Sequence, residues 1–340
     1  MIMMKKISKK VKIIAAAVIA VIAAVVLSVV YMNNIPYETM NKNAQKYSVN
    51  DVDLSVGGDR IYFLNTGSAD AIIIESEGKF ALVDAAEDSD NPRGFDNLVF
   101  EGTEQYVADA IKKIAGNKKG KAQLEFVLGT HSHSDHIGGM DTVILDEAIT
   151  VKKAYIKEYD ESKIVPYEIE HWDNKEVYGQ MLSACEKRGV PVIHSIPEES
   201  FSFGNFTLTF CNVNDGEAEE LVGENDNAVG LLVEKNGMRA FLAADIDNKS
   251  GDEDTLAKQI GKINLLKVGH HGYDYSTTEN FVNTLKPEIA VVTNREKGIS
   301  RTPLDNLNKA GACVFETGKY NGVVADFSSD EILLFGNINV

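Results

Sequence analysis

Hydrophobic residues form one long run near the N-terminus and many short runs over the rest of the chain. The long run, residues 13–32, is apolar apart from Ser28. A helix of this length spans roughly 30 Å, the hydrocarbon thickness of a bilayer. Five lysines precede the run, and positive charge on that side favours an N-terminus in the cytoplasm. The pattern predicts a basic cytoplasmic segment at residues 1–12, a single-pass transmembrane signal-anchor helix at residues 13–32, and an extracytoplasmic domain.

A cleaved signal peptide is the alternative interpretation of this run, and it would make the protein secreted. Signal peptides usually have a shorter apolar core followed by a cleavage site of small residues, whereas this run ends in LSVVYMNN. We therefore favour an uncleaved anchor. The following residues, 33–56, are polar and lack sustained periodicity, so we predict a tether between the membrane and the domain.

Short apolar runs bounded by glycine, serine and charged residues begin at residue 57 and predict buried strands. Segments with helical spacing at residues 103–115 and 174–189 lie between them. The pair Asn236-Gly237 between two apolar runs predicts a hairpin. Strands thus alternate with helices as well as with hairpins, which predicts a layered α/β domain with mixed sheets over residues 57–340.

The charge of the chain restricts its partners. The net charge is -17, and without the five N-terminal lysines 29 basic residues stand against 51 acidic ones. An acidic surface repels phosphate backbones, so binding of nucleic acid would need a locally basic groove. The three cysteines lie far apart and form no CxxC, which excludes a disulfide framework and a cysteine zinc site.

The segment HSHSDH, residues 131–136, directly follows an apolar strand. In an extended segment His131 and His133 point the same way and can reach one metal ion, while Asp135 and His136 can face a second ion. Imidazole nitrogen and carboxylate oxygen are the usual ligands of zinc and similar divalent ions. The glycine pair at residues 138–139 permits close backbone packing after the site. The segment therefore predicts a site for two divalent ions.

HxHxDH is the signature of the metallo-β-lactamase superfamily of metal-dependent hydrolases, which the chain resembles over residues 57–336. The resemblance implies the αββα sandwich of that family, with two mixed β-sheets flanked by helices, and a binuclear metal centre. It also implies that Asp84 braces the metal loop and that Asp245 bridges both ions. We assign the late histidine ligand to His271, which leaves His270 beside the ions or as a proton donor, although these two residues could exchange roles.

One departure from the family pattern concerns the histidine that many members carry before the bridging aspartate. His171 and His194 lie in the interval, but neither directly precedes the strand that leads to Asp245. That place holds ENDNAV, and our hypothesis is that Asp226 takes it, with Asn227 nearby. A carboxylate ligand makes a harder site, so we expect zinc and note that manganese would also suit it. The predicted ligands are His131, His133 and Asp226 for the first ion and Asp135, His136 and His271 for the second, with Asp245 shared.

The resemblance implies hydrolysis by a water ionised between the two ions, which would lie about 3.5–4 Å apart. Asp135 and His270 are the predicted catalytic residues, His270 as the group that protonates the leaving oxygen. Two subgroups of the family are similar to this chain. One is the metallo-β-lactamase-like domain of competence-type DNA-uptake proteins. The other is the phosphorylcholine esterase of teichoic acid, whose catalytic domain is similar to THSHSDHIGGMD, WDNKEVYG and INLLKVGHHG.

A choline head group is recognised by aromatic faces and acidic residues. Tyr155, Tyr159 and Trp172 are the predicted substrate rim. The first hypothesis is thus a membrane-anchored phosphodiesterase for phosphorylcholine-like or other cell-envelope phosphoesters. The alternative is a competence-type nuclease, the only hypothesis in which nucleic acid is a partner. A third hypothesis, from another class, is a tethered binding module with a degenerate metal site.

Overall fold

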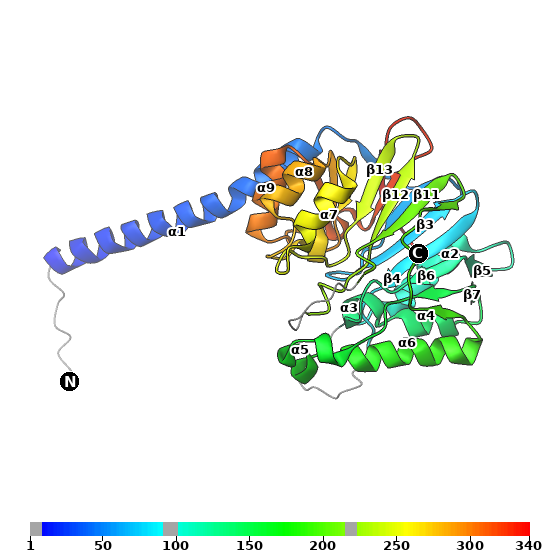
Figure 1. Cartoon of the computed structure of the whole chain (residues 1–340). Helices are drawn as coiled ribbons and strands as arrows, with labels where there is room; N and C mark the ends of the chain where they lie inside the picture. The colour runs from blue at the N-terminus through cyan, green and yellow to red at the C-terminus, as the bar shows by residue number, and fades with distance from the viewer. Residues whose placement is uncertain (1–8, 91–100, 215–222) are drawn as a thin grey trace.

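Two β-sheets form the centre of the molecule and pack face to face (Figure 1). The computed structural model describes residues 9–90, 101–214 and 223–340. The first sheet has the strand order β1-β18-β17-β2-β3-β4-β6-β8-β9 and the second β10-β11-β12-β13-β14-β15-β16. The strands of the first sheet are β1 Val49–Asp51, β2 Arg60–Phe63, β3 Ala71–Ser76, β4 Lys79–Ala85, β6 Phe126–Leu128, β8 Ala154–Tyr155, β9 Val192–Ile193, β17 Val323–Asp326 and β18 Leu333–Gly336. The strands of the second sheet are β10 Phe201–Phe203, β11 Phe206–Cys211, β12 Gly230–Lys235, β13 Met238–Leu242, β14 Leu265–Lys267, β15 Ile289–Val292 and β16 Cys313–Glu316.

Helices cover the outer face of each sheet. Those on the first sheet are α2 Glu104–Ala115, α4 Met140–Leu145 and α6 Asn174–Arg188, near the small sheet of β5 Ala122–Leu124 and β7 Ile149–Val151. Those on the second are α7 Asp252–Ile260, α8 Glu279–Leu285 and α9 Arg301–Ala310. The predicted αββα sandwich with mixed sheets is confirmed. The remaining elements are α1 Lys9–Ala44, α3 Ser134–Ile137, α5 Pro166–His171, α10 Thr317–Tyr320 and two 3₁₀ turns, Glu161–Lys163 and Gly269–Gly272.

The main apolar core lies between the two sheets. Phe126, Phe206 and Phe315 are fully buried in it, together with aliphatic residues from both inner faces. Each strand also turns apolar residues outward, because helices cover both outer faces and bury them as well. The near-continuous apolar runs of the sequence therefore follow from burial on two sides. This packing fixes the strand ends that carry the polar residues described below.

The predicted helices and the hairpin are found where the pattern placed them. Asn236 and Gly237 both have positive φ, as a two-residue turn between β12 and β13 requires. Gly189 ends α6 in the left-handed conformation and donates its N–H to the carbonyls of Cys185 and Glu186. Thr103 precedes α2, although its side chain makes no capping hydrogen bond.

Within the described ranges, no helix is long and apolar enough to cross a membrane. Residues 1–8 of the predicted cytoplasmic segment lie outside the described residues, as do many of the side chains of residues 13–32. The anchor therefore stays a prediction.

Much of the segment predicted as a tether, residues 33–56, has regular structure and packs on the domain. Residues up to Ala44 continue helix α1, and β1 pairs in parallel with β18. Tyr37, Met40 and Ala44 follow one another at helical spacing and pack onto the domain, Met40 against the cluster of α9 and β16. The Tyr37 hydroxyl also donates to the Ile299 carbonyl at 3.1 Å. Three apolar positions are too few to give a recognisable helical periodicity in the sequence. The helix forms here because tertiary packing of these side chains stabilises it.

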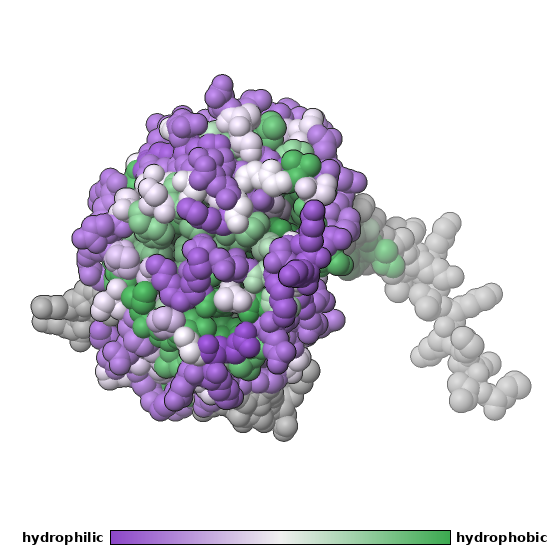
Figure 2. Space-filling view, turned by 90° about the vertical axis from the view of Figure 1, so that its right-hand side faces the viewer, coloured by the Kyte–Doolittle hydropathy of each residue, from purple (hydrophilic) through white to green (hydrophobic). Residues whose placement is uncertain are grey.

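Hydrophilic residues make up most of the outline of the molecule when it is viewed from the right-hand side of Figure 1 (Figure 2). Hydrophobic residues show between them, mainly in the central and lower parts of this face. This end of the molecule, where Figure 1 places β5 and β7, is therefore a mixed surface, whereas the large apolar clusters lie between the layers.

Replacing Met40 with alanine should lower the free energy of unfolding by about 2–5 kcal/mol, because the substitution leaves a cavity in a packed cluster. Met40 is 2% exposed, whereas Met32 on the same helix is 62% exposed. Met32→Ala is thus the matched control and should change the free energy by no more than about 0.5 kcal/mol. Urea unfolding of the full chain, followed by circular dichroism, measures both. Equal effects would show that the end of α1 does not pack on the domain.

Candidate metal centre

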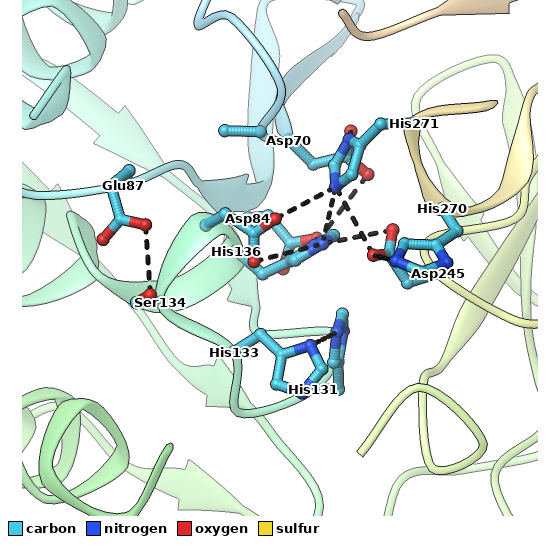
Figure 3. Close-up of polar contacts among 12 residues, drawn as sticks. Asp70, Asp84, Glu87, His131, His133, Ser134, His136, Asp245, His270 and His271 are labelled. Carbon is cyan, nitrogen blue, oxygen red and sulfur yellow. Dashed lines mark hydrogen bonds and ion pairs between the residues drawn. The ribbon is translucent and has the colours of Figure 1, made fainter. Parts of the chain in front are cut away.

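Polar residues from both sheets meet at one end of the sandwich (Figure 3). The loop that carries His131 and His133 follows β6 of the first sheet, and Asp84 is in β4 of that sheet. From the second sheet, Asp245 follows β13 and His271 follows β14. Segments far apart in sequence thus deliver their side chains to one place, since strand ends at the same edge of a packed pair of sheets lie close together.

Four side chains converge as one group of metal donors: Asp135, His136, Asp245 and His271. Their ligand atoms all lie within 4.8 Å of one another. The Nε2 atoms of His136 and His271 are 3.2 Å apart, and His271 Nε2 is 3.3 Å from Asp135 Oδ2 and 3.4 Å from Asp245 Oδ2. Tetrahedral bonds of about 2.0–2.1 Å put zinc ligands about 3.3 Å apart. These donors therefore fit a single divalent ion.

The other nitrogen of each of these imidazoles is held from behind. His136 Nδ1 lies 2.8 Å from Asp84 Oδ2, and Asp84 also accepts from the Thr130 N–H and hydroxyl, each at 2.8 Å. His271 Nδ1 lies 3.2 Å from Thr293 Oγ1. A hydrogen on Nδ1 leaves the Nε2 lone pair for the centre in both residues. Oriented in this way, two Nε2 lone pairs at 3.2 Å face one another and need a cation between them.

A second pair of donors lies beside this group. His131 Nε2 and His133 Nδ1 are 3.1 Å apart, again the spacing of two ligands on one ion. His133 uses its outer nitrogen differently, since Nε2 lies 3.3 Å from Glu168 Oε2. Burial lowers the pKa of His131 well below its usual value, so its ring is neutral and can bind a metal. In the part of the chain that the structure describes, one ion would have four converging donors and the other two imidazoles.

Asp226 does not join the centre, which corrects the hypothesis that it replaces a histidine. Its Oδ2 accepts from the Ser250 hydroxyl at 2.7 Å, and its side chain lines a separate cavity with Asn212 and Ser250. The preceding Asn225 faces the centre instead, with Nδ2 3.4 Å from His270 Nε2. Consecutive residues of this tight turn point in different directions, which composition alone did not reveal.

Asn227 lies behind the metal loop and not in the centre. Its Nδ2 donates to Glu224 Oε1 at 3.3 Å, and Glu224 Oε2 accepts the Ser132 N–H at 2.8 Å. Ser132 lies between His131 and His133 in the metal loop. Asn227 therefore contacts this loop indirectly, through the Glu224 carboxylate.

His270 stands at the edge of the centre. Its Nε2 is 3.8 Å from Asp245 Oδ2, and its side chain is about a quarter exposed to the cavity described below. Burial lowers the pKa of His270, so the ring is neutral at pH 7. His271 is fully buried among the donors. The structure therefore places His271 among the donors and His270 at their edge.

The electrostatics of the site favour cations. Burial would raise the pKa of Asp245, but the imidazoles of His136 and His271 outweigh it and hold this pKa well below its usual value. Conversely, burial would lower the pKa of His136, yet Asp245 and Asp84 hold it well above its usual value. Without a metal, protonated histidines supply the positive charge that stabilises these carboxylates. A bound metal ion would supply that charge instead.

A cavity of about 640 Å³ opens onto the centre. Its lining includes His133, Asp135, Asp245 and His270 on the metal side. The other walls include Trp172, Tyr273, Glu87, Glu101 and Asp173, and none of the described residues that line the cavity is a lysine or arginine. Burial raises the pKa of Glu87 to about 9, so this carboxyl is protonated at pH 7.

Of the three predicted rim residues, only Trp172 lines this cavity. Its ring lies edge-on to His133, with ring centroids 4.6 Å apart. The prediction for Tyr155 was wrong, because its ring is buried between the sheets against Phe126 and Phe210. Tyr159 packs against Tyr178, with ring centroids 6.0 Å apart, and is not part of the cavity lining.

Several residues of the centre adopt backbone conformations that L-residues rarely take. Asp84, Ala244, His270 and His271 all have positive φ, between 46° and 57°. Each such residue costs on the order of 1–3 kcal/mol and persists only where the surrounding structure holds it. Here the strain aims side chains from strand ends into one centre.

Sequence reasoning missed the residues that support the ligands: Asp70, Glu168, Lys267 and Thr293. Asp70 and Lys267 are fully buried and form an ion pair. Each had a weak signal, since Asp70 directly precedes the apolar run AIII and Lys267 is the single charge in INLLKVG. Thr293 carried no signal of its own, and Glu168 stood out only as one of several acidic residues close to Trp172 in the sequence.

Comparison with protein families gives one match to this region. A family described as "Beta-lactamase superfamily domain" matches residues 82–279, a range that contains all the metal donors described above.

The chain is also similar to individual proteins. It is 24% identical over 178 residues to ComE operon protein 3 of Bacillus subtilis, covering 52% of this chain and 20% of that protein. It is 26% identical over 113 residues to Recombination protein 2 of Haemophilus influenzae, covering 32% of this chain and 14% of that protein. The chain thus spans a fifth or less of these relatives. The metallo-β-lactamase fold protein YhfI of Bacillus subtilis superposes with a TM-score of 0.44 at 12% identity, over 78% of this chain and 98% of that one.

Asp245→Ala should remove at least one bound ion per chain, whereas Asp226→Ala should leave the metal content unchanged. Asp245 belongs to the converging donors, but Asp226 is bonded to Ser250. Mass spectrometry of metals in gel-filtered full-length protein measures this directly. A loss of metal from Asp226→Ala as large as that from Asp245→Ala would restore Asp226 as a ligand.

Proposed function

The chain belongs to the metallo-β-lactamase superfamily of metal-dependent hydrolases, and on that premise we propose that it is a two-metal phosphodiesterase for small phosphoesters with a cationic group. Phosphorylcholine-like decorations of the cell envelope are the proposed substrate class. The observation that carries this proposal is the convergence of the donors on the floor of a cavity whose walls are aromatic and acidic.

The donor set supports zinc as the metal. Four of the donors are imidazole nitrogens, from His131, His133, His136 and His271. Imidazole nitrogen suits zinc, whereas harder ions prefer sites made of oxygen ligands. The argument for manganese depended on a carboxylate from Asp226, which the centre lacks. When bound, two such ions would make water a nucleophile near neutral pH and withdraw charge from the phosphoryl oxygens.

The residues of the chain itself position the ester. Asp135 lines the cavity and is also one of the metal donors. The metal centre is therefore open to a substrate on the side of this carboxylate. His270 lies at the edge of the same cavity, where its ring N–H could hydrogen-bond the leaving oxygen. Trp172 and Tyr273 line the cavity beside these residues.

The walls of the cavity favour a cationic group over a polyanion. Trp172 and Tyr273 offer aromatic faces, and Glu101 and Asp173 add carboxylates. A quaternary ammonium is attracted by both kinds of group. Among the lining residues within the described ranges, a nucleic-acid backbone would meet no lysine or arginine, and the chain as a whole carries a net charge of -17.

A nuclease of the competence type is the second candidate. The similarity to ComE operon protein 3 and to Recombination protein 2 favours it, and the first alignment covers half of this chain. The same donors could hydrolyse a phosphodiester of DNA if the strand reached the cavity. We rank it second because of the charge of the cavity walls.

Purified full-length protein loaded with zinc should hydrolyse p-nitrophenyl phosphorylcholine, and chelation should abolish the activity. Absorbance of released p-nitrophenolate measures the rate. The comparison substrate is bis-p-nitrophenyl phosphate, which has the same leaving group but no cation. Trp172→Ala should raise the KM of the choline ester about 5–30-fold, as expected for loss of a desolvated cation–π contact of 1–2 kcal/mol. The kinetics of the comparison substrate should change much less.

An equal effect of Trp172→Ala on both substrates would remove the cation subsite but not the hydrolase. Metal-dependent cleavage of single-stranded DNA, without hydrolysis of the choline ester, would favour the nuclease. Full metal loading with no activity on any phosphoester would contradict both candidates.

We also propose that the N-terminal helix anchors the chain in a membrane. Support comes from Val18, Ile19 and Ile22, which are exposed on α1. The full chain should then stay with membranes after an alkaline carbonate wash. Release into the supernatant would contradict the anchor.

A further inference from the structure

Lys267 is a fully buried lysine at the back of the metal centre. It ends strand β14, three residues before His270, and its Nζ has three oxygen neighbours. It forms an ion pair with Asp70 Oδ2, donates to the Ala244 carbonyl at 2.9 Å, and lies 3.7 Å from Asp245 Oδ1. An ammonium has three hydrogens to donate, so all of them can be directed at these oxygens. Burial of such a charge is unfavourable unless partners of this kind surround it.

The ion pair fixes the direction of a chain of hydrogen bonds that ends on a metal ligand. An ionised Asp70 can only accept, and its Oδ1 accepts the Thr293 hydroxyl at 2.5 Å. Because the hydroxyl proton points to Asp70, Thr293 Oγ1 is left to accept from His271 Nδ1 at 3.2 Å. The hydrogen of His271 then resides on Nδ1, and its Nε2 lone pair faces the other donors.

The second effect of Lys267 is on the residue expected to bridge the two ions. The Nζ lies beside Asp245 Oδ1, and the backbone carbonyl that it binds belongs to Ala244, which has positive φ. Lys267 therefore holds the strained turn through the Ala244 carbonyl and adds positive charge 3.7 Å from Asp245 Oδ1. That oxygen lies 3.1 Å from His136 Nε2, while Asp245 Oδ2 lies toward His271 and His270.

We propose that Lys267 is a positioning residue, which prepares His271 and Asp245 for metal binding through the chain Lys267–Asp70–Thr293 and through the turn at Ala244. This role of Lys267 goes beyond the proposed phosphodiesterase, since it concerns metal binding, which does not depend on the identity of the substrate. Metal affinity and ester hydrolysis are measured separately, so failure of either proposal can be told from failure of the other.

Electrostatic repulsion alone predicts the opposite effect of Lys267 on metal affinity. A lysine near two divalent cations repels them, so removing its charge would tighten metal binding. Lys267 and Asp70 together carry no net charge, however, so the pair adds little repulsion while it orients the ligands. Positioning thus predicts weaker metal binding on loss of Lys267, and a role as a mere counter-charge predicts tighter binding.

The experiment compares Lys267→Met with Lys235→Met in the full chain. Lys235 is a matched control, because its Nζ also pairs with an aspartate, Asp59 at 2.5 Å, and with a carbonyl, that of Phe327 at 2.6 Å, but away from the centre. Competition with a chromophoric chelator measures zinc affinity, and the cobalt-loaded proteins report ligand geometry in their visible spectra. Lys267→Met should bind zinc about 10–100-fold more weakly and alter the cobalt spectrum, as loss of ligand support does. Lys235→Met should lower stability alone.

Thr293→Val tests the same chain without changing a charge and serves if Lys267→Met does not fold. It should also weaken zinc binding, since His271 Nδ1 loses its acceptor at 3.2 Å and keeps only the longer approach to Asp70 Oδ1 at 3.5 Å. Melting temperatures with and without zinc separate the roles, because the rise caused by zinc should shrink in Lys267→Met and Thr293→Val but not in Lys235→Met. Wild-type or tighter zinc affinity in both centre variants would overturn the proposal.

Discussion

Carboxylates buried at the end of an apolar sandwich can stay ionised only if positive charge surrounds them. Asp70, Asp84 and Asp245 meet in a volume where water cannot solvate them, and the effective penalty is several kcal/mol for each unpaired ion. The structure meets this constraint with Lys267 and with histidines whose pKa it raises. A divalent ion meets it more completely, so the same residues that destabilise an empty centre create its affinity for metal.

The sandwich holds these groups by rigid elements and short, strained turns. His131, Asp245 and His271 closely follow the ends of strands, Asp135 and His136 lie in the short helix α3 after β6, and the strands belong to two sheets packed on a shared aromatic core. The glycine pair after the metal loop shows how tight this packing is, because a Cβ on Gly139 would come within 2.4 Å of the Ala85 carbonyl oxygen. Positions fixed in this way are preorganised, so little reorganisation is needed when a metal binds.

Function depends on what surrounds the ions as much as on the ions themselves. Imidazole donors favour some divalent metals over others, whereas the lining of the cavity beside them restricts which substrates can bind. Trp172 belongs to both, because its ring packs against His133 and also lines the cavity. A family that shares the donors can therefore act on different substrates when the walls change. For this chain the acidic and aromatic walls are the basis of the proposed cationic substrate.

Local sequence determined most of the strands and helices, because their apolar periodicities match the burial that two packed sheets impose. It also determined the loop at residues 131–136, since a cluster of three histidines and an aspartate after a strand has few other uses. Tertiary structure decided the rest. Only packing shows that Asn225 and not Asp226 faces the centre, that Tyr155 is core, and that residues 33–44 are helical. The physical reason is that the direction of a side chain in a turn, and the partner of a buried charge such as Lys267, depend on segments far away in sequence.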